Sequence, residues 1–266
     1  MGLAALLSSA MLAVTPASYV ASHQQADGGF AETGSPSTPG LTAWAMLGLR
    51  SAGRPTGSAY DYLSANERGL QSATDIELAL IAEAATGRIS ETLYARLAAL
   101  RRPDGRIGPA INSTAWGILA YAQVGRPVKL RVSYLLRQQR RSGGWGWIAG
   151  VAPDSNDTAA AIQALRTQGV RGRPITRAVA FLRRLQNSDG GFELTAGRGS
   201  DAQSTAWAIQ AFIAAHVKPP AGAFRYLAAL RRGDGSFRYS RKYAATPVWV
   251  TSQVLPALAR KPFPLR

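Results

Sequence analysis

The chain has 266 residues, enough to bury a substantial core in one large domain or two small ones. It contains no cysteine, which excludes disulfides, thiolate metal ligands and a cysteine nucleophile. The net charge of +16 raises the question of a polyanionic partner.

The N-terminal segment has two interpretations. Gly2 to Val14 is an uncharged, apolar stretch of the length of a signal-peptide core, too short for a transmembrane helix. The basic residues that normally precede such a core are missing, so a buried first helix is the alternative. We expect residues 1–16 to be a signal peptide or an N-terminal apolar segment and the protein to be exported, with cleavage at one of the small residues between Ser8 and Ala17.

From residue 17 onward the chain is built of repeats. A glycine-containing turn such as QNSDGGF is followed about 12 residues later by an apolar segment such as STAWAIQAF. These segments align on one threonine column, at steps of 32 to 47 residues: Thr42, Thr74, Thr114, Thr158, Thr205 and Thr251. A period of this size indicates stacked supersecondary units. We expect one repeat domain over residues 17–260 and a basic, proline-rich tail over 261–266.

Each unit is predicted to contain two helices. The first is amphipathic, as over 175–186, and ends in the glycine turn. The second begins at Ser, Thr or Asp and is apolar nearly all round, so it should be buried on every side. In the degenerate unit at 72–84, Thr74 and Glu77 fit a capping box. The expected fold is therefore all-α: a closed α/α toroid of six helix hairpins with inner and outer rings. An open superhelix is the alternative.

The turn motif resembles that of a known superfamily. Gln, Gly and an aromatic residue recur at fixed spacing, as in Gln24, Gly28 and Phe30, then in Gln139, Gly143 and Trp145, then in Gln186, Gly190 and Phe192. This pattern is similar to the repeat of squalene and related triterpene cyclases, whose toroid is shared with protein prenyltransferase β subunits. It is also similar to the repeats of cobalamin-carrier and complement-type toroids. The resemblance implies the fold and leaves the activity open.

The segment DSNDT corresponds to the catalytic motif that the resemblance implies, except at the position of the proton donor. Cyclases of this family start by protonation from the middle acid of an Asp-x-Asp-Asp-Thr motif; Asp154 and Asp157 match its flanking acids, and Asn156 occupies the place of the proton donor. A carboxamide is no proton donor for an alkene. Asp157 also shares its repeat column with Ser113 and Ser204, which predicts that it caps a helix. The family's cavity lies between two helical domains, and this chain has residues for one.

Other chemistries have less support. The zinc site of the prenyltransferases needs a cysteine, and His23 and His216 stand in unrelated contexts, so we expect no metal and no cofactor. A paired-carboxylate glycosidase or lyase using Asp154, Asp157 and Asp201 is a further alternative.

Five tryptophans are candidates for ligand contact. Trp44, Trp116 and Trp207 share one column, two residues after the threonine. Their packing between the helix layers is favoured over a position in a cavity. Trp147 and Trp249 are expected in loops, where they would edge a pocket.

These observations favour a non-catalytic or divergent toroid protein that binds a ligand or partner at the N-terminal rim of the inner helices. The predicted ligand is an apolar or isoprenoid small molecule, contacted by the tryptophans and Asp201. Arginine pairs recur once per repeat near outer-helix ends, which argues against specific nucleic-acid binding and leaves attraction to an anionic membrane or cell-wall surface open. The alternative is a class II, protonation-initiated terpenoid cyclase with Asp154 or Asp157 as a displaced acid.

Overall fold

The computed structural model describes residues 14–126 and 132–265, so most of the predicted signal segment lies outside the described residues. The described part forms twelve α-helices, one 3-10 turn and one short pair of strands. Their bounds are α1 (Pro16–Ala21), α2 (Pro39–Ser51), α3 (Ala59–Asn66), η1 (Glu67–Gly69), α4 (Ala73–Ala84), α5 (Glu91–Ala99), α6 (Ile111–Val124), α7 (Ser133–Arg137), α8 (Ser155–Thr167), α9 (Arg173–Arg184), β1 (Phe192–Glu193), β2 (Ser200–Asp201), α10 (Ala202–Ala214), α11 (Ala221–Leu230) and α12 (Pro247–Leu258).

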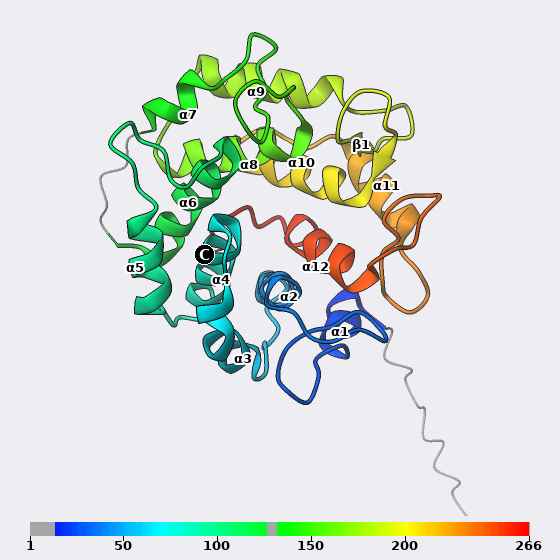
Figure 1. The fold of residues 1–266 in the computed structure, drawn as a ribbon. Coiled ribbons are helices and arrows are strands. Elements are labelled where there is room, and N and C mark those ends of the chain that lie inside the picture. The colour runs from blue at the N-terminus through cyan, green and yellow to red at the C-terminus, as the bar shows by residue number, and fades with distance from the viewer. Residues whose placement is uncertain (1–13, 127–131, 266) are drawn as a thin grey trace, which may run out of the picture.

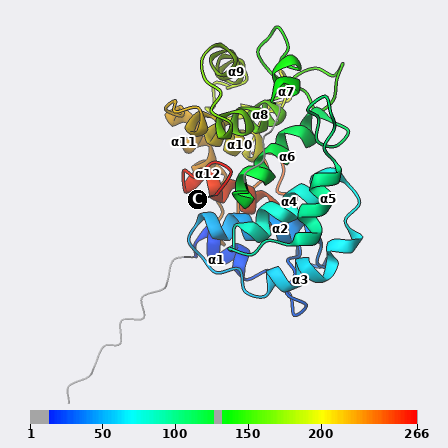
Figure 2. The same cartoon turned by 90° about the vertical axis from the view of Figure 1, so that its left-hand side faces the viewer.

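The even-numbered helices form a closed inner ring. Each packs against the next along the chain, and α12 returns to pack against α2 (Figure 1). The odd-numbered helices α1, α3, α5, α7, α9 and α11 lie outside this ring, as the side view also shows (Figure 2). The six-hairpin α/α toroid predicted from the repeats is therefore confirmed, and the open superhelix is wrong.

Burial explains which helix of each pair lies inside. In α10, ten of the residues from Ala202 to Phe212 are buried, because this helix has an outer helix behind it and inner neighbours on both sides. In α9 the buried residues recur every three or four positions, while Arg183 and Arg184 point to solvent at its C-terminal end. Cations at that end are favoured by the helix dipole. The other arginine pairs, at 101–102, 140–141 and 231–232, lie in the turns just after α5, α7 and α11.

The recurring spacing between turn and threonine allows a hydrogen bond between them. The threonine hydroxyl accepts the backbone N–H of the turn's last residue, as from Trp145 to Thr158 at 3.0 Å and from Phe192 to Thr205 at 2.8 Å. The motif glutamine closes the turn itself: the amide of Gln186 donates to the carbonyl of Gly190 at 2.9 Å. The glutamine thus stabilises the turn, and the threonine binds the turn, with its buried aromatic side chain, to the inner helix.

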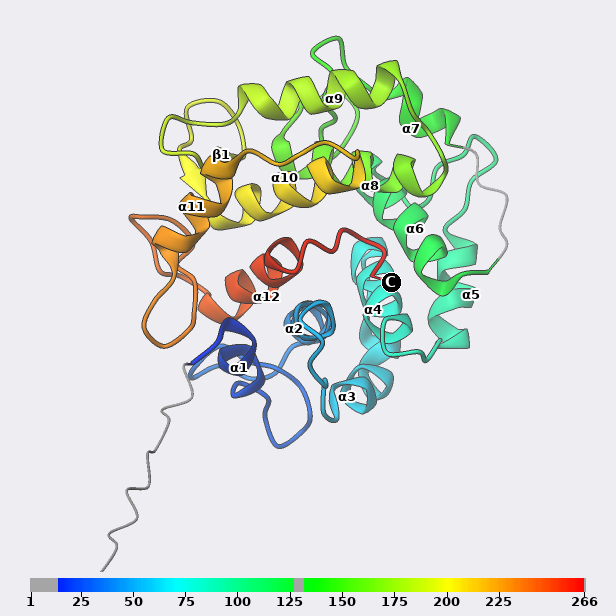
Figure 3. The same ribbon diagram turned by 180° about the vertical axis from the view of Figure 1, so that it is seen from behind.

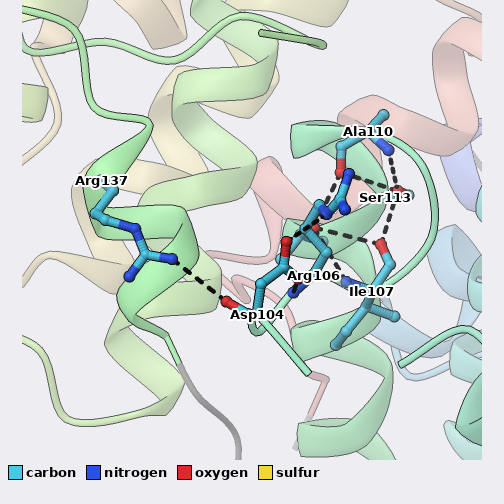
Figure 4. A network of polar contacts seen from close by, with 7 residues as sticks. Asp104, Arg106, Ile107, Ala110, Ser113 and Arg137 are labelled. Atoms are coloured by element: carbon cyan, nitrogen blue, oxygen red, sulfur yellow. Dashed lines mark hydrogen bonds and ion pairs between the residues drawn. The ribbon is translucent and has the colours of Figure 1, made fainter. Parts of the chain in front are cut away.

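Helix α6 has an alanine at the cap position, so a residue of its first turn makes the polar contacts there. Ala110 stands at the cap position, and Ser113 takes over: its hydroxyl accepts the N–H of Ala110 at 3.0 Å and donates to the carbonyl of Ile107 at 2.8 Å (Figure 4). The preceding turn is held by Asp104, whose carboxylate accepts from Arg106 at 2.8 Å.

The predicted place of Thr74 in the threonine column is wrong. Helix α4 is capped by Ser72, whose hydroxyl accepts the N–H of Asp75 at 3.0 Å, so Thr74 and Glu77 form no capping box. Counted from its cap, the residue in the threonine column is Ile76. Glu77 is fully buried, neither of its carboxyl oxygens has a hydrogen-bond partner among the described residues, and burial raises its pKa. Among the described helices, none is long and apolar enough to cross a membrane.

Candidate ligand-binding pocket

The first turns of the six inner helices meet at one end of the ring and surround a cavity of about 280 Å³. Every inner helix contributes to its wall. The lining residues are Gly40, Trp44, Thr74, Asp75, Leu78, Asn112, Trp116, Asn156, Gln203, Trp207, Trp249 and Gln253.

Two layers of side chains make up this central pocket. The outer layer comes from the second residue of each inner helix, or the third in α12, and it is mainly polar: Gly40, Thr74, Asn112, Asn156, Gln203 and Trp249. The inner layer lies four residues further along, one helical turn deeper: Trp44, Leu78, Trp116, Trp207 and Gln253. Residues four apart lie on one helix face, so the repeat itself produces a polar rim above an aromatic floor.

The floor consists of three tryptophans that touch edge to face. The ring centroids of Trp44 and Trp116 are 5.7 Å apart, those of Trp44 and Trp207 5.7 Å, and those of Trp116 and Trp207 5.2 Å. This is the favoured geometry for aromatic pairs. The three side chains are nearly buried, but they meet at the centre of the ring and face the pocket, so the prediction that they pack between the two helix layers is wrong.

Gln253 adds a polar group at the depth of this floor. Its Oε1 accepts the indole N–H of Trp207 at 2.9 Å, which fixes the orientation of the amide. Its Nε2 is then buried without a hydrogen-bond partner among the described residues. An unpaired buried donor costs about 1–3 kcal/mol. An acceptor oxygen reaching Nε2 would recover that cost.

The acids of DSNDT sit beside the pocket rather than in its lining. Asp154 is the helix cap, since its Oδ1 accepts the N–H of Asp157 at 2.8 Å; the prediction that Asp157 is the cap is wrong. Asp157 stands in the third position, where its Oδ1 accepts the side-chain amide of Asn112. Asn156, in the place of the family's proton donor, lines the pocket. Asp201 repeats the cap of Asp154, accepting the N–H of Ser204 at 2.7 Å.

Burial changes the ionisation of this acid pair. It raises the pKa of Asp157 to about 8, with the neighbouring charge of Asp154 acting in the same direction and the hydrogen bond from Asn112 opposing it. Burial also raises the pKa of Asp154. Asp157 is therefore mainly protonated at neutral pH. Among the residues that line the pocket, Asp75 carries a carboxyl group, and it is exposed at the pocket mouth.

The other residues that the sequence predicted to contact a ligand do not all lie in the central pocket. Trp249 belongs to α12 instead of a loop, and its ring centroid lies 6.3 Å from that of Trp44. Trp147 is 54% exposed and is absent from the pocket lining. Asp201 lines a different cavity, of about 390 Å³, together with Tyr226 and Tyr239. Among the described residues, no three His, Asp or Glu side chains form a group that could hold a metal ion.

The sequence pattern did not identify eight of the pocket residues: Gly40, Thr74, Asp75, Leu78, Asn112, Asn156, Gln203 and Gln253. The second residue of an inner helix and the residue four positions later lie on the same helix face. Applying this spacing to every unit, starting from the tryptophan column, would have identified most of these residues.

No protein-family model and no curated protein matches the chain. Solved structures do. The type II terpene cyclase MstE from Scytonema matches with a TM-score of 0.72 at 16% identity, over 92% of this chain and 95% of that one. The ent-copalyl diphosphate synthase from Streptomyces platensis matches at 0.59 and 21% identity, over 85% of this chain and 51% of that one. Candida albicans protein geranylgeranyltransferase-I matches at 0.64 and 12% identity, over 83% of both chains.

These likenesses show that the chain has the α/α-toroid fold of the terpenoid cyclase and protein prenyltransferase superfamily, as the turn motif indicated. In the sequence, the presence of a single helical domain counted against cyclisation, and the match to MstE removes that objection. A type II terpene cyclase is matched over 95% of its own chain, so the length of this protein does not argue against cyclisation.

Proposed function

We propose that the protein binds an isoprenoid chain in the central pocket. The observation that carries this proposal is the floor of Trp44, Trp116 and Trp207, which offers aromatic surface from three helices to one small cavity. Aromatic side chains bury a large apolar area, which suits a hydrocarbon ligand. A volume of about 280 Å³ lies just below the usual range for small-molecule sites, which fits a slender chain.

The polar groups favour a chain with an oxygen-bearing end. Asn112, Asn156 and Gln203 surround the mouth, and Gln253 lines the pocket further in. Solved structures with this fold support the ligand class. A variant of MstE has been solved with geranylgeranyl dihydroxybenzoate as its substrate, and the Candida albicans enzyme with GGPP.

A binding titration tests the proposal. Geraniol, farnesol and geranylgeraniol are added to the wild type while tryptophan emission is followed. We expect saturable quenching in the wild type and in Trp147→Leu, whose indole lies outside the pocket, and weaker binding by tenfold or more in Trp116→Leu. Equal affinity in Trp116→Leu and the wild type, or no binding of any alcohol, would contradict it.

Protonation-initiated cyclisation is the second candidate function. The likeness to type II terpene cyclases favours it over a role without catalysis. Asn156 provides no proton, so another residue must act as the acid. Asp157 holds a proton at neutral pH and bonds to Asn112 of the pocket wall, and Asp75 lines the pocket directly. An acid that keeps its proton near neutral pH is what alkene protonation requires.

Product analysis decides this second candidate. The protein is incubated with squalene and with geranylgeranyl diphosphate, and products are compared for wild type, Asp157→Asn and Asp75→Asn. A cyclised product that disappears in one variant identifies the acid. Absence of any cyclised product from the wild type would reject cyclisation of these substrates. Asp154→Ala is compared with these variants, because it removes the helix cap, which should lower stability by about 1 kcal/mol, and also removes the neighbouring charge that helps to raise the pKa of Asp157.

A further inference from the structure

The C-terminal tail, residues 259–265, closes the ring from the end opposite the pocket. It leaves α12 and crosses the ring toward α4, as the view from behind shows (Figure 3). Phe263 is 2% exposed and belongs to the main hydrophobic core. We propose that Phe263 forms a second layer beneath the tryptophan floor and thereby limits the length of chain that the pocket accepts. This inference rests on the proposed function.

Contacts between aromatic rings place Phe263 directly behind the floor. Its ring centroid lies 6.2 Å from that of Trp44 and 5.9 Å from that of Trp116. Both tryptophans also face the pocket, whereas Phe263 is absent from the pocket lining. The indoles are therefore held between the cavity and the tail. An indole can turn away from a longer ligand only where space is open behind it, and Phe263 fills that space.

Two glutamines of the inner ring hold the tail by its backbone. The Oε1 of Gln163 on α8 accepts the N–H of Phe263 at 2.8 Å. The amide of Gln123 on α6 makes two bonds to Leu265, accepting its N–H at 2.8 Å and donating to its carbonyl at 3.0 Å. Gln163 is the ninth residue of α8 and Gln123 the thirteenth of α6, so both lie deeper in the ring than the pocket layers.

A sister position shows what the tail contributes to Gln163. Gln210 is the ninth residue of α10, as Gln163 is of α8, and both side chains are 1% exposed. The Oε1 of Gln210 is buried with no hydrogen-bond partner among the described residues. The Oε1 of Gln163 has the N–H of Phe263. The repeat thus supplies the glutamine twice, and the tail satisfies one copy, which ties the position of Phe263 to the ring.

The experiment uses the full chain with Trp147→Phe as background, since this removes the exposed indole. Phe263→Ala opens the space behind the floor, and Phe263→Leu keeps most of the apolar volume in case the alanine variant fails to fold. Gln163→Leu removes the bond to the tail, and Gln210→Leu is its matched control in the same column. Affinities for geraniol, farnesol and geranylgeraniol are measured by fluorescence, and acrylamide quenching is measured without ligand.

We expect the preference for geranylgeraniol over geraniol to rise about tenfold or more in Phe263→Ala, because the longer chain can then bury additional methylene groups in the opened space. Gln163→Leu should show a smaller rise and Gln210→Leu none. Without ligand, Phe263→Ala should be quenched more strongly than the background protein, since the indoles lose their cover. An unchanged length preference in folded Phe263 variants would overturn the inference.

The ligand-free measurement separates the two proposals. If the background protein binds none of the alcohols, the proposed function and the length limit both fail. Quenching that increases in Phe263→Ala or Phe263→Leu would still establish that the tail covers the floor, and unchanged quenching would refute that as well.

Discussion

The buried acid pair at the start of α8 predicts a specific pH dependence of stability. The pKa of Asp157 is about 8 in the folded protein, against an ordinary value of 3.8. Below about pH 4 both states hold the proton. Between about pH 4 and pH 8 the unfolded chain releases it while the folded protein keeps it, so stability falls with rising pH and levels off above about pH 8. At about 1.4 kcal/mol per pKa unit, the fall is at most about 6 kcal/mol, and the actual fall is smaller because Asp154 shares the charge.

Asp157→Asn should remove this fall. An asparagine has the shape of the protonated acid, and its Oδ1 can accept the bond from Asn112. We expect the variant to match the wild type within about 1 kcal/mol at pH 4 and to exceed it by several kcal/mol at pH 9.

Urea unfolding at both pH values measures the difference. Burial also raises the pKa of Glu77 and raises that of Glu83 to about 8, but these groups are common to both proteins and cancel in the comparison. An identical change of stability with pH in wild type and Asp157→Asn would refute the argument.

Three further outcomes are expected. Thr158→Val removes the acceptor of the Trp145 amide and should cost about 1–3 kcal/mol in urea unfolding, whereas Thr176→Val on the exposed face of α9 should cost less than about 1 kcal/mol. Asn156→Asp places a carboxyl group in the pocket lining and should increase any cyclised product from geranylgeranyl diphosphate; no increase, measured by mass spectrometry, would argue against proton delivery from that position. Export remains a proposal: N-terminal sequencing of protein from the medium should find cleavage no later than Val14, because α1 packs its buried residues against α12 and α2, and an uncleaved N-terminus would contradict it.

The repeat made most of the fold predictable. Each turn and each threonine appears several times, so their common role could be inferred from spacing before any geometry was known. The exceptions have physical causes. Asp154 and Asp157 could each cap α8, because Asp is favourable at the cap and again in the first turn. In α4 the presence of a threonine at position 74 placed this residue in the threonine column, but the cap at Ser72 shows that Ile76 occupies that column.

The pocket was harder to predict because it depends on ring closure. The spacing of Trp44, Trp116 and Trp207 shows that they share a helix face, but their mutual contact arises only when α12 packs against α2. Phe263 lies outside every repeat, so no periodic signal indicated that it would enter the core. Gln253 was missed for a related reason: it stands in the tryptophan column with a different side chain.

The central claim is that an isoprenoid chain occupies the pocket above the tryptophan floor. The most direct measurement is a crystal structure of the protein with the prenyl alcohol that binds most tightly in the titration. The account predicts ligand density in contact with Trp44, Trp116 and Trp207, with its oxygen near Gln253 or the polar rim. Density for the alcohol only elsewhere on the protein, with an empty space above the three indoles, would contradict it.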